Sequence, residues 1–175
     1  MKEKIINATI EALKSIQQTR FFETERGYQG VFYCELRTRL ASNFSLNNDV
    51  ILEMEYQKSH RHGIEKNQRP DIILHIPAEL HGRSIRDDNF AVWALKHRAS
   101  SAEALDDFEK LKEMFDQLHY PLGFFINVDS TKHQLEHYTG DFPDRIHTFA
   151  VKLIGGEVSI IHASLVENEI CEEQI

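Results

Sequence analysis

The sequence predicts an α/β domain in which helices cover a mixed β-sheet, and three observations predict it. Apolar runs of strand length alternate with longer segments whose apolar residues recur every three or four positions. One helical segment lies between two nearly continuous apolar runs, and this order implies a right-handed crossover between parallel strands. Gly155 and Gly156 separate the last two apolar runs, which is typical of a β-hairpin.

Two amphipathic helices are predicted at the start of the chain. Residues 2–17 carry apolar side chains at helical spacing along one stripe. After a break near residue 30, Phe32, Leu36 and Leu40 form the stripe of a second helix that ends near residue 43. Glu35 is about 60° from Phe32 around this helix at about 100° per residue, so it lies at the border of the buried face.

Three strands are predicted next, over residues 50–56, 71–76 and 90–96. Prolines bound the second run without interrupting it, which a strand tolerates. Asp71 and His75 project from the same face of this strand, because side chains alternate along it. The third run is apolar up to Lys96, so we expect a strand that is buried on both faces.

The second half of the chain continues the alternation. Ser100 and Glu103 have the spacing of a capping box and begin a helix whose stripe includes Leu105 and which stops at Pro121. The remaining expectations are a strand over residues 122–128, a short helix over 131–138, hairpin strands over 148–154 and 158–165, and a frayed, solvated acidic tail over 167–173.

The composition is that of one domain spanning residues 1–175. The chain has 41% hydrophobic residues, enough for a core, and a net charge of −8. It has no run of 18 apolar residues and no apolar leader, so we expect a cytoplasmic protein that does not enter a membrane. Cys34 and Cys171 are the only cysteines, too few for a disulfide framework, which agrees with a reducing compartment.

Positive charge concentrates in residues 57–98, where eight basic residues accompany five acidic ones. Five of the ten histidines lie in the same segment and add charge at mildly acidic pH. An anionic partner would meet this segment first. The alternative is that these loops carry Lys and Arg only for solubility.

Asp71 and Lys96 are charged residues at the ends of otherwise apolar strands. Because burying an unpaired ionised group is costly, we expect the two side chains to lie near each other or near an ion. The alternative is an ordinary ion pair at the end of a sheet.

With these residues and this order of elements, the chain resembles the PD-(D/E)xK nuclease-like superfamily, whose core runs helix, strand, strand, strand, helix, strand. The match covers residues 28–128, with Asp71 after Pro70 on one strand and Lys96 on the next. The resemblance implies a restriction-endonuclease-like core within the α/β fold, with an N-terminal helix and a C-terminal β-hairpin outside it.

The resemblance also implies a nuclease, a hydrolase that uses Mg²⁺ or Mn²⁺ to cleave phosphodiester bonds in nucleic acid. Carried over to this chain, Asp71 is a metal ligand, Lys96 positions the attacking water or binds phosphate, and Glu35 is the supporting acid on the helix. The alternative for Glu35 is a salt bridge with Arg39.

Ala94 departs from the superfamily pattern, which has an acidic residue two positions before the lysine. Ala94 shares the face of Lys96, so a ligand oxygen is missing there. A few branches of the superfamily place this acid on the following helix, and Glu109 has that spacing here. Glu109 lies at the flank of the helix stripe, so the alternative is that it simply faces water. Glu55, on the neighbouring strand, is the other possible substitute. The alternative function is an inactive nuclease-fold protein that acts as a binding or regulatory module.

A nucleic-acid partner would be bound by basic residues near the Asp71 and Lys96 site. The residues expected to bind its backbone are Lys58, Arg61, Lys66, Arg69 and Arg98. The first helix and the final hairpin lie outside the core that the resemblance covers, which leaves them available for a homodimer interface.

His133, Glu136 and His137 have the H-x-x-E-H spacing of an inverted zinc-protease motif. A zinc site would need a third ligand, for which only the acidic tail is available. The alternative is a polar helix surface, since five-residue matches arise easily in a chain with ten histidines.

Overall fold

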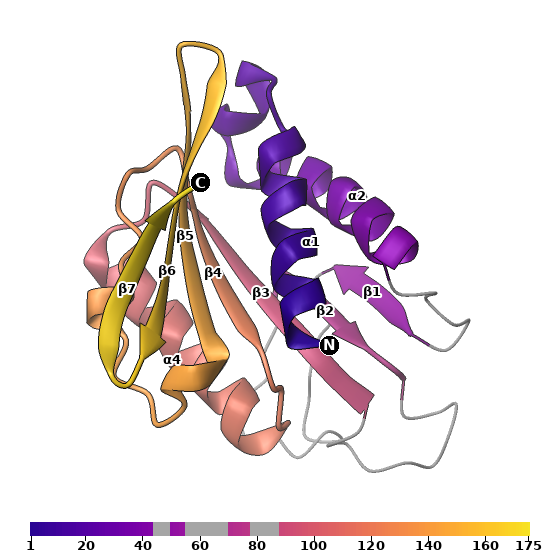
Figure 1. Ribbon diagram of the computed structural model, residues 1–175, viewed down its shortest axis with the longest axis vertical. Helices are drawn as coiled ribbons and strands as arrows, with labels where there is room; N and C mark the ends of the chain where they lie inside the picture. Colours follow the sequence, from indigo (N-terminus) through magenta and orange to yellow (C-terminus); the bar gives the residue numbers. More distant parts are fainter. Residues whose placement is uncertain (44–49, 55–69, 78–87) are drawn as a thin grey trace.

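The computed structural model describes residues 1–43, 50–54, 70–77 and 88–175. Within these residues, seven strands form one mixed sheet, and their order across it is the order of the chain, from β1 to β7 (Figure 1). The strands are β1 (Ile51–Met54), β2 (Ile72–His75), β3 (Asn89–His97), β4 (Gly123–Val128), β5 (Ile146–Ile154), β6 (Glu157–Val166) and β7 (Glu169–Gln174). The predicted α/β class with helices flanking a mixed sheet is confirmed.

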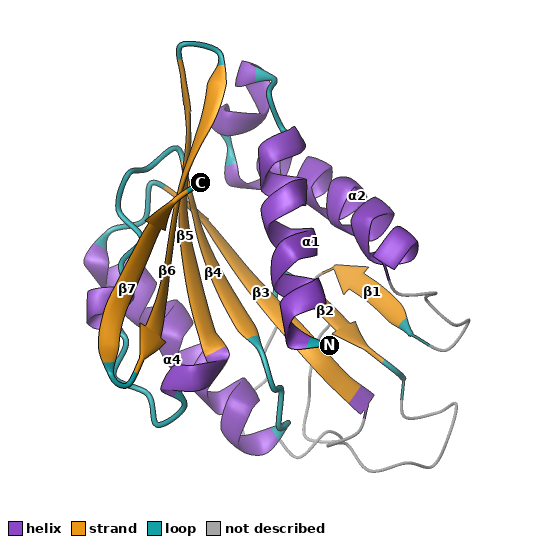
Figure 2. Cartoon of the chain, in the orientation of Figure 1, coloured by secondary structure: helices purple, strands orange, loops and turns teal. Residues whose placement is uncertain are grey.

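Helices cover both faces of the sheet. Helices α1 (Lys2–Ser15) and α2 (Glu25–Asn43) lie side by side on one face and are joined by the 3-10 helix η1 (Thr19–Glu23). Helix α4 (Ser101–Gln117) covers the opposite face (Figure 2). The sheet therefore has an α1–α2 face and an α4 face, each with its own apolar core.

The strand directions follow from the connections. Pairs β3–β4 and β4–β5 are parallel, and the other neighbouring strands are antiparallel. Helix α4 supplies the predicted crossover between β3 and β4. Side chains alternate along β3, so that Trp93 packs in the core of the α1–α2 face and stacks on Phe124, while Val92 packs in the core of the α4 face.

Short sequence features fix both ends of the α4 crossover. Ser100 caps α4 through a complete capping box with Glu103, and these hydrogen bonds lower the pKa of the Glu103 carboxyl. Gly123 begins β4 beneath α4, where a Cβ atom would overlap the Phe115 ring. The prediction that Leu105 belongs to the buried stripe is wrong, because this side chain is exposed.

Two predictions for the C-terminal third are wrong. The expected helix over residues 131–138 is only the 3-10 turn Leu135–His137, because Gln134 has a positive φ of 63° that interrupts any α-helix. The expected acidic tail is strand β7, which pairs with β6 while its side chains remain exposed. The predicted β5–β6 hairpin is confirmed, with Gly155 and Gly156 at the positive φ values its turn requires.

Candidate functional site

Asp71 and Lys96 reach the same pocket from neighbouring antiparallel strands. Ile72 pairs with Trp93, so Asp71, immediately before β2, lies beside the C-terminal half of β3. The backbone N–H of Leu95 donates a 2.7 Å hydrogen bond to Asp71 Oδ2 and holds the carboxylate there. Lys96 lies on the same face of β3 as Ala94, and both line the pocket with Asp71.

Helix α4 brings a second carboxylate to this pocket. Asp107 is buried, and its Oδ2 lies 3.4 Å from Lys96 Nζ. Among the described residues, none donates a hydrogen bond to this oxygen. The other oxygen, Oδ1, accepts a 2.6 Å hydrogen bond from Lys110 Nζ one turn further along the helix. Asp107 is thus held between two ammonium groups.

Helix α2 approaches the site from the other side of the sheet. Glu25 Oε1, in its first turn, lies 3.6 Å from Lys96 Nζ. Gln29, one turn later, donates a 3.2 Å hydrogen bond from Nε2 to the backbone carbonyl of Asp71. Both helices that contact the site are therefore anchored to the Asp71 and Lys96 strands.

The pocket has a volume of about 130 Å³. Its charged lining groups come from β3, α4 and the residue immediately before β2, and most of its apolar lining comes from β3 and α4. The lining residues are Pro70, Asp71, Val92, Ala94, Lys96, Asp107, Lys110, Leu111 and Met114. The small Ala94 side chain takes up little of this space, and the pocket is large enough to hold water molecules beside the carboxylates.

Burial and the neighbouring charges shift the pKa values of both Asp71 and Lys96. Burial raises the pKa of Asp71 to about 6, the nearby charges of Asp107 and Glu25 act in the same direction, and Leu95 N–H and Lys96 oppose them. Burial acts to lower the pKa of Lys96, but Asp107, Glu25 and Asp71 together outweigh it and raise this pKa. Lys96 is therefore protonated at neutral pH, and Asp71 is mostly ionised there although burial disfavours its charge.

The candidate acids from the sequence lie in different places. Glu35 accepts a 2.9 Å hydrogen bond from Ser15 Oγ and pairs with Arg39 at 3.5 Å, and it does not line the pocket. Glu109 is exposed on α4 and does not line it either. Glu55 lies outside the described residues.

Asp107 and Glu25 were missed by sequence reasoning. Asp107 precedes Leu111 by four positions in the buried stripe of α4, so a polar residue interrupting an apolar stripe was the available signal. Glu25 was missed because the sequence placed the helix start after Gly27 and Gly30, whereas α2 begins at Glu25 and includes both glycines.

Of the expected nucleic-acid contacts, only Arg98 is described. Its side chain is 66% exposed at the end of β3, and its Nε donates a 2.7 Å hydrogen bond to Asp129 Oδ2. Lys58, Arg61, Lys66 and Arg69 lie outside the described residues.

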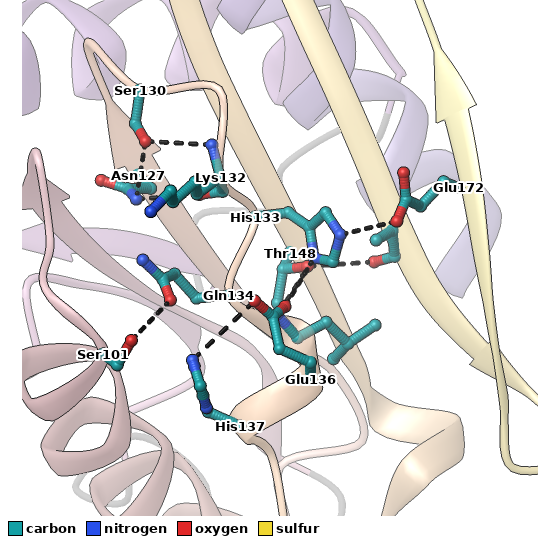
Figure 3. A network of polar contacts seen from close by, with 12 residues as sticks. Ser101, Asn127, Ser130, Lys132, His133, Gln134, Glu136, His137, Thr148 and Glu172 are labelled. Atoms are coloured by element: carbon teal, nitrogen blue, oxygen red, sulfur yellow. Dashed lines mark hydrogen bonds and ion pairs between the residues drawn. The ribbon is translucent and has the colours of Figure 1, made fainter.

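The His133, Glu136 and His137 motif forms part of a polar network rather than a helix face (Figure 3). His133 Nδ1 accepts a hydrogen bond from the Leu135 backbone N–H, and its Nε2 lies 2.9 Å from Glu172 on β7. Over residues 1–43, 50–54, 70–77 and 88–175, no three His, Cys, Asp or Glu side chains form a group that could hold a metal ion. The pocket on the α4 face accordingly offers two carboxylates from its own lining, Asp71 and Asp107.

Comparisons with protein-family models, with curated proteins and with solved structures return no match. No helix in the described part of the chain is long and apolar enough to cross a membrane.

Proposed function

We propose that this protein is a divalent-cation-dependent phosphodiesterase that acts on nucleic acid, with Asp71, Asp107 and Lys96 as its principal groups. The observation that carries the proposal is the position of Asp107. It contributes a buried carboxylate to the pocket from α4, close to the strand position where Ala94 leaves no acid. The described elements also run helix, three strands, helix, strand, from α2 to β4, in the order that suggested a nuclease core.

The pocket residues fit Mg²⁺ or Mn²⁺. Protein sites for Mg²⁺ often use one or two carboxylates and keep several waters, and substrate phosphates complete the coordination. Asp71 and Asp107 supply the two carboxylates. Each oxygen of Asp107 already faces an ammonium group, Lys110 at Oδ1 and Lys96 at Oδ2, so an ion at Asp107 would have to displace one of them. A bound divalent ion would polarise the phosphate and lower the pKa of a coordinated water.

Leu95, Lys96 and Glu25 have the remaining roles at the site. Leu95 N–H fixes Asp71 Oδ2 through the 2.7 Å hydrogen bond, which holds this carboxylate in the pocket lining. Lys96 is protonated and 25% exposed, so its ammonium can orient the attacking water or neutralise charge that develops on the phosphate. Glu25 holds that ammonium from the α2 side.

A second candidate function is a binding module that has lost the reaction. The specific observation in its favour is that Lys96 is already paired with Asp107 and Glu25, which together neutralise the charge that a phosphate would meet. The net charge of −8 also weakens binding to a polyanion.

Metal titration tests the proposed site. We expect millimolar Mn²⁺ to raise the melting temperature of the wild-type protein, because binding to the folded state alone stabilises it. Asp71→Ala and Asp107→Ala should abolish this rise. Glu109→Ala is the matched control, since Glu109 lies two positions after Asp107 on α4 but is exposed, and it should respond as the wild type does.

Cleavage assays decide between the two functions. Mg²⁺-dependent cutting of supercoiled or single-stranded DNA that falls sharply in Lys96→Ala supports the phosphodiesterase. Metal binding without any cutting favours the binding module. The metal site itself would be contradicted if Mn²⁺ does not change the melting temperature of the wild type. It would also be contradicted if Mn²⁺ raises that of Asp107→Ala as much as that of the wild type.

A further inference from the structure

We infer that Lys110 is an exchangeable counter-ion of Asp107, and that its ammonium binds a substrate phosphate at the pocket mouth once a divalent cation occupies the carboxylates. This inference rests on the proposed function and adds a phosphate-binding residue to it. It concerns a side chain that neither the motif nor the basic segment of the sequence indicated.

Lys110 joins the buried part of the pocket to solvent. Its Nζ donates a 2.6 Å hydrogen bond to Asp107 Oδ1, and the two residues are three positions apart on α4. The side chain of Lys110 is 52% exposed, whereas that of Asp107 is only 4% exposed. The ammonium of Lys110 therefore lies at the pocket mouth while its partner carboxylate lies inside.

The two ammonium groups on Asp107 are not equivalent. Lys96 lies on the opposite oxygen at 3.4 Å, is 25% exposed and is also paired with Glu25 at 3.6 Å, so it is anchored between two acids. Lys110 has the shorter contact but more access to water, and its four-carbon stem is flexible. Of these two lysines, Lys110 is the one that can leave Asp107 at low cost.

A divalent cation at the carboxylates would compete directly with Lys110. The ammonium neutralises Asp107 Oδ1 in the cation-free protein, and two positive groups cannot share that oxygen without repulsion. Once displaced, the ammonium remains beside the pocket mouth, because α4 carries its backbone. A phosphate that approaches the cation carries at least one negative charge, so it is the ligand that best matches the freed ammonium.

Because of this exchange, Lys110 should weaken the binding of Mn²⁺ and strengthen the binding of DNA. Lys110→Met removes the competitor, so we expect Mn²⁺ to bind about fivefold more tightly, in line with the strength of a partly exposed ion pair. The same substitution removes a phosphate contact, so a single-stranded DNA oligonucleotide should bind more weakly. The slope of its log affinity against log salt concentration should then fall by about one. A residue that only supported the helix would not produce this pair of changes.

The experiment uses the full chain and two separate probes. Mn²⁺ binding is measured by titration calorimetry on the metal-free protein, and DNA binding by fluorescence anisotropy with a labelled phosphorothioate oligonucleotide in the presence of Mn²⁺. Lys110→Arg should restore most of the DNA affinity because it keeps the positive charge. Lys112→Met is the control, since it lies two positions further along α4, about 200° around the helix, and is not among the lining residues.

The outcomes distinguish a failure of this inference from a failure of the proposed function. Mn²⁺ and DNA affinities that are unchanged in Lys110→Met, or changed equally in Lys112→Met, would overturn this inference and leave the proposed function standing. If the wild type binds no Mn²⁺ and Asp107→Ala has no effect, the proposed function fails and this inference fails with it. Circular dichroism and the melting temperature of each variant verify that the fold is intact.

Discussion

Asp71 is a carboxylate that the folded protein stabilises poorly in the absence of a cation. Burial raises its pKa from 3.8 to about 6, although Leu95 N–H and Lys96 both favour the charged form. Because the folded state binds the proton more tightly than the unfolded state, the resulting stabilisation is present below about pH 4 and is lost as the pH rises through 6. At neutral pH the protein therefore carries a destabilising negative charge at Asp71.

Asp71→Asn should consequently stabilise the metal-free protein at pH 8 but not at pH 4. The upper limit of the gain is about 3 kcal/mol, since each pKa unit corresponds to about 1.4 kcal/mol, and asparagine can still accept the hydrogen bond from Leu95. Urea unfolding at the two pH values measures the difference. Asp106→Asn, an exposed position on α4, is the control. An equal gain at both pH values would contradict the assigned cause.

Gly123 and Gly30 differ in what a side chain would meet. A Cβ atom at Gly123 would overlap Phe115, whereas one at Gly30, within α2, would meet nothing within 4 Å. Gly123→Ala should therefore destabilise the protein by about 1–3 kcal/mol through overpacking beneath α4. Gly30→Ala should stabilise it by about 0.5–1 kcal/mol, because alanine restricts the unfolded chain and favours the helix. Urea midpoints that shift in the same direction for both variants would contradict this contrast.

Among the elements, the β5–β6 pair carries a stacked histidine pair on the α1–α2 face. His147 Nδ1 and His162 Nε2 lie 2.9 Å apart, and the two rings stack against each other. Burial lowers the pKa of His147 from 6.5 to about 4, with smaller contributions from the charges of His162 and Lys2. One nitrogen of the pair must donate and the other accept, so this contact requires at least one neutral ring.

The contribution of His147 to the free energy of unfolding should therefore fall between pH 6.5 and pH 4, while Asp71 contributes in the opposite direction, so the His147 effect is the difference between the wild type and His147→Phe. The unfolded chain takes up a proton on His147 below pH 6.5, while the folded protein resists it down to about pH 4, so stability is full above this range and is lost through it. The loss attributable to His147 is at most about 3 kcal/mol. Urea midpoints at pH 7 and pH 5 measure it. His147→Phe should reduce the pH dependence, and His137→Gln, on the 3-10 turn, should leave it intact.

Elements with local signals were predictable from the sequence, and elements set by tertiary pairing were not. The capping box of α4 and the glycine turn of the β5–β6 hairpin are encoded in a few adjacent residues, and both predictions are confirmed. The sequence of strand β7 has no apolar alternation. The strand forms through backbone pairing with β6, which its own residues do not signal. The turn at residues 131–138 is held by buried amides: Asn127 Nδ2 donates a 2.8 Å hydrogen bond to the Lys132 carbonyl, and Gln134 Nε2 donates a 3.0 Å hydrogen bond to the Ala99 carbonyl.

The same distinction applies to the candidate site. Asp71 and Lys96 could be proposed from the sequence because a charge in an apolar strand is a local anomaly. Which acid on α4 joins them depends on how the helix is rotated over the sheet, and that rotation is set by packing of its whole apolar stripe. Asp107 lines the pocket and Glu109 is exposed for this reason.

At the scale of the whole molecule, helices protect the two faces of the sheet, but β7 leaves an edge strand. Every residue of β7 is exposed. In the described sheet β7 pairs with β6 on one side, and its other side is an open edge. An exposed edge is a template for pairing with another chain, and charged side chains are a common protection against it. Glu169, Glu172 and Glu173 place three negative charges along this one edge.

We therefore predict that these glutamates prevent association of two copies through β7. In an antiparallel pairing of two β7 strands, each acidic strand would face another acidic strand, and like charges directly opposite are destabilising. A Glu169→Gln, Glu172→Gln, Glu173→Gln triple variant removes the charges while keeping side-chain size, so it should form dimers or larger species in light scattering after gel filtration. The matched triple variant Glu3→Gln, Glu11→Gln, Glu109→Gln removes equal charge from helices and should behave like the wild type. If both triple variants associate alike, net charge rather than the edge is responsible; if neither does, the acidic edge does not control association.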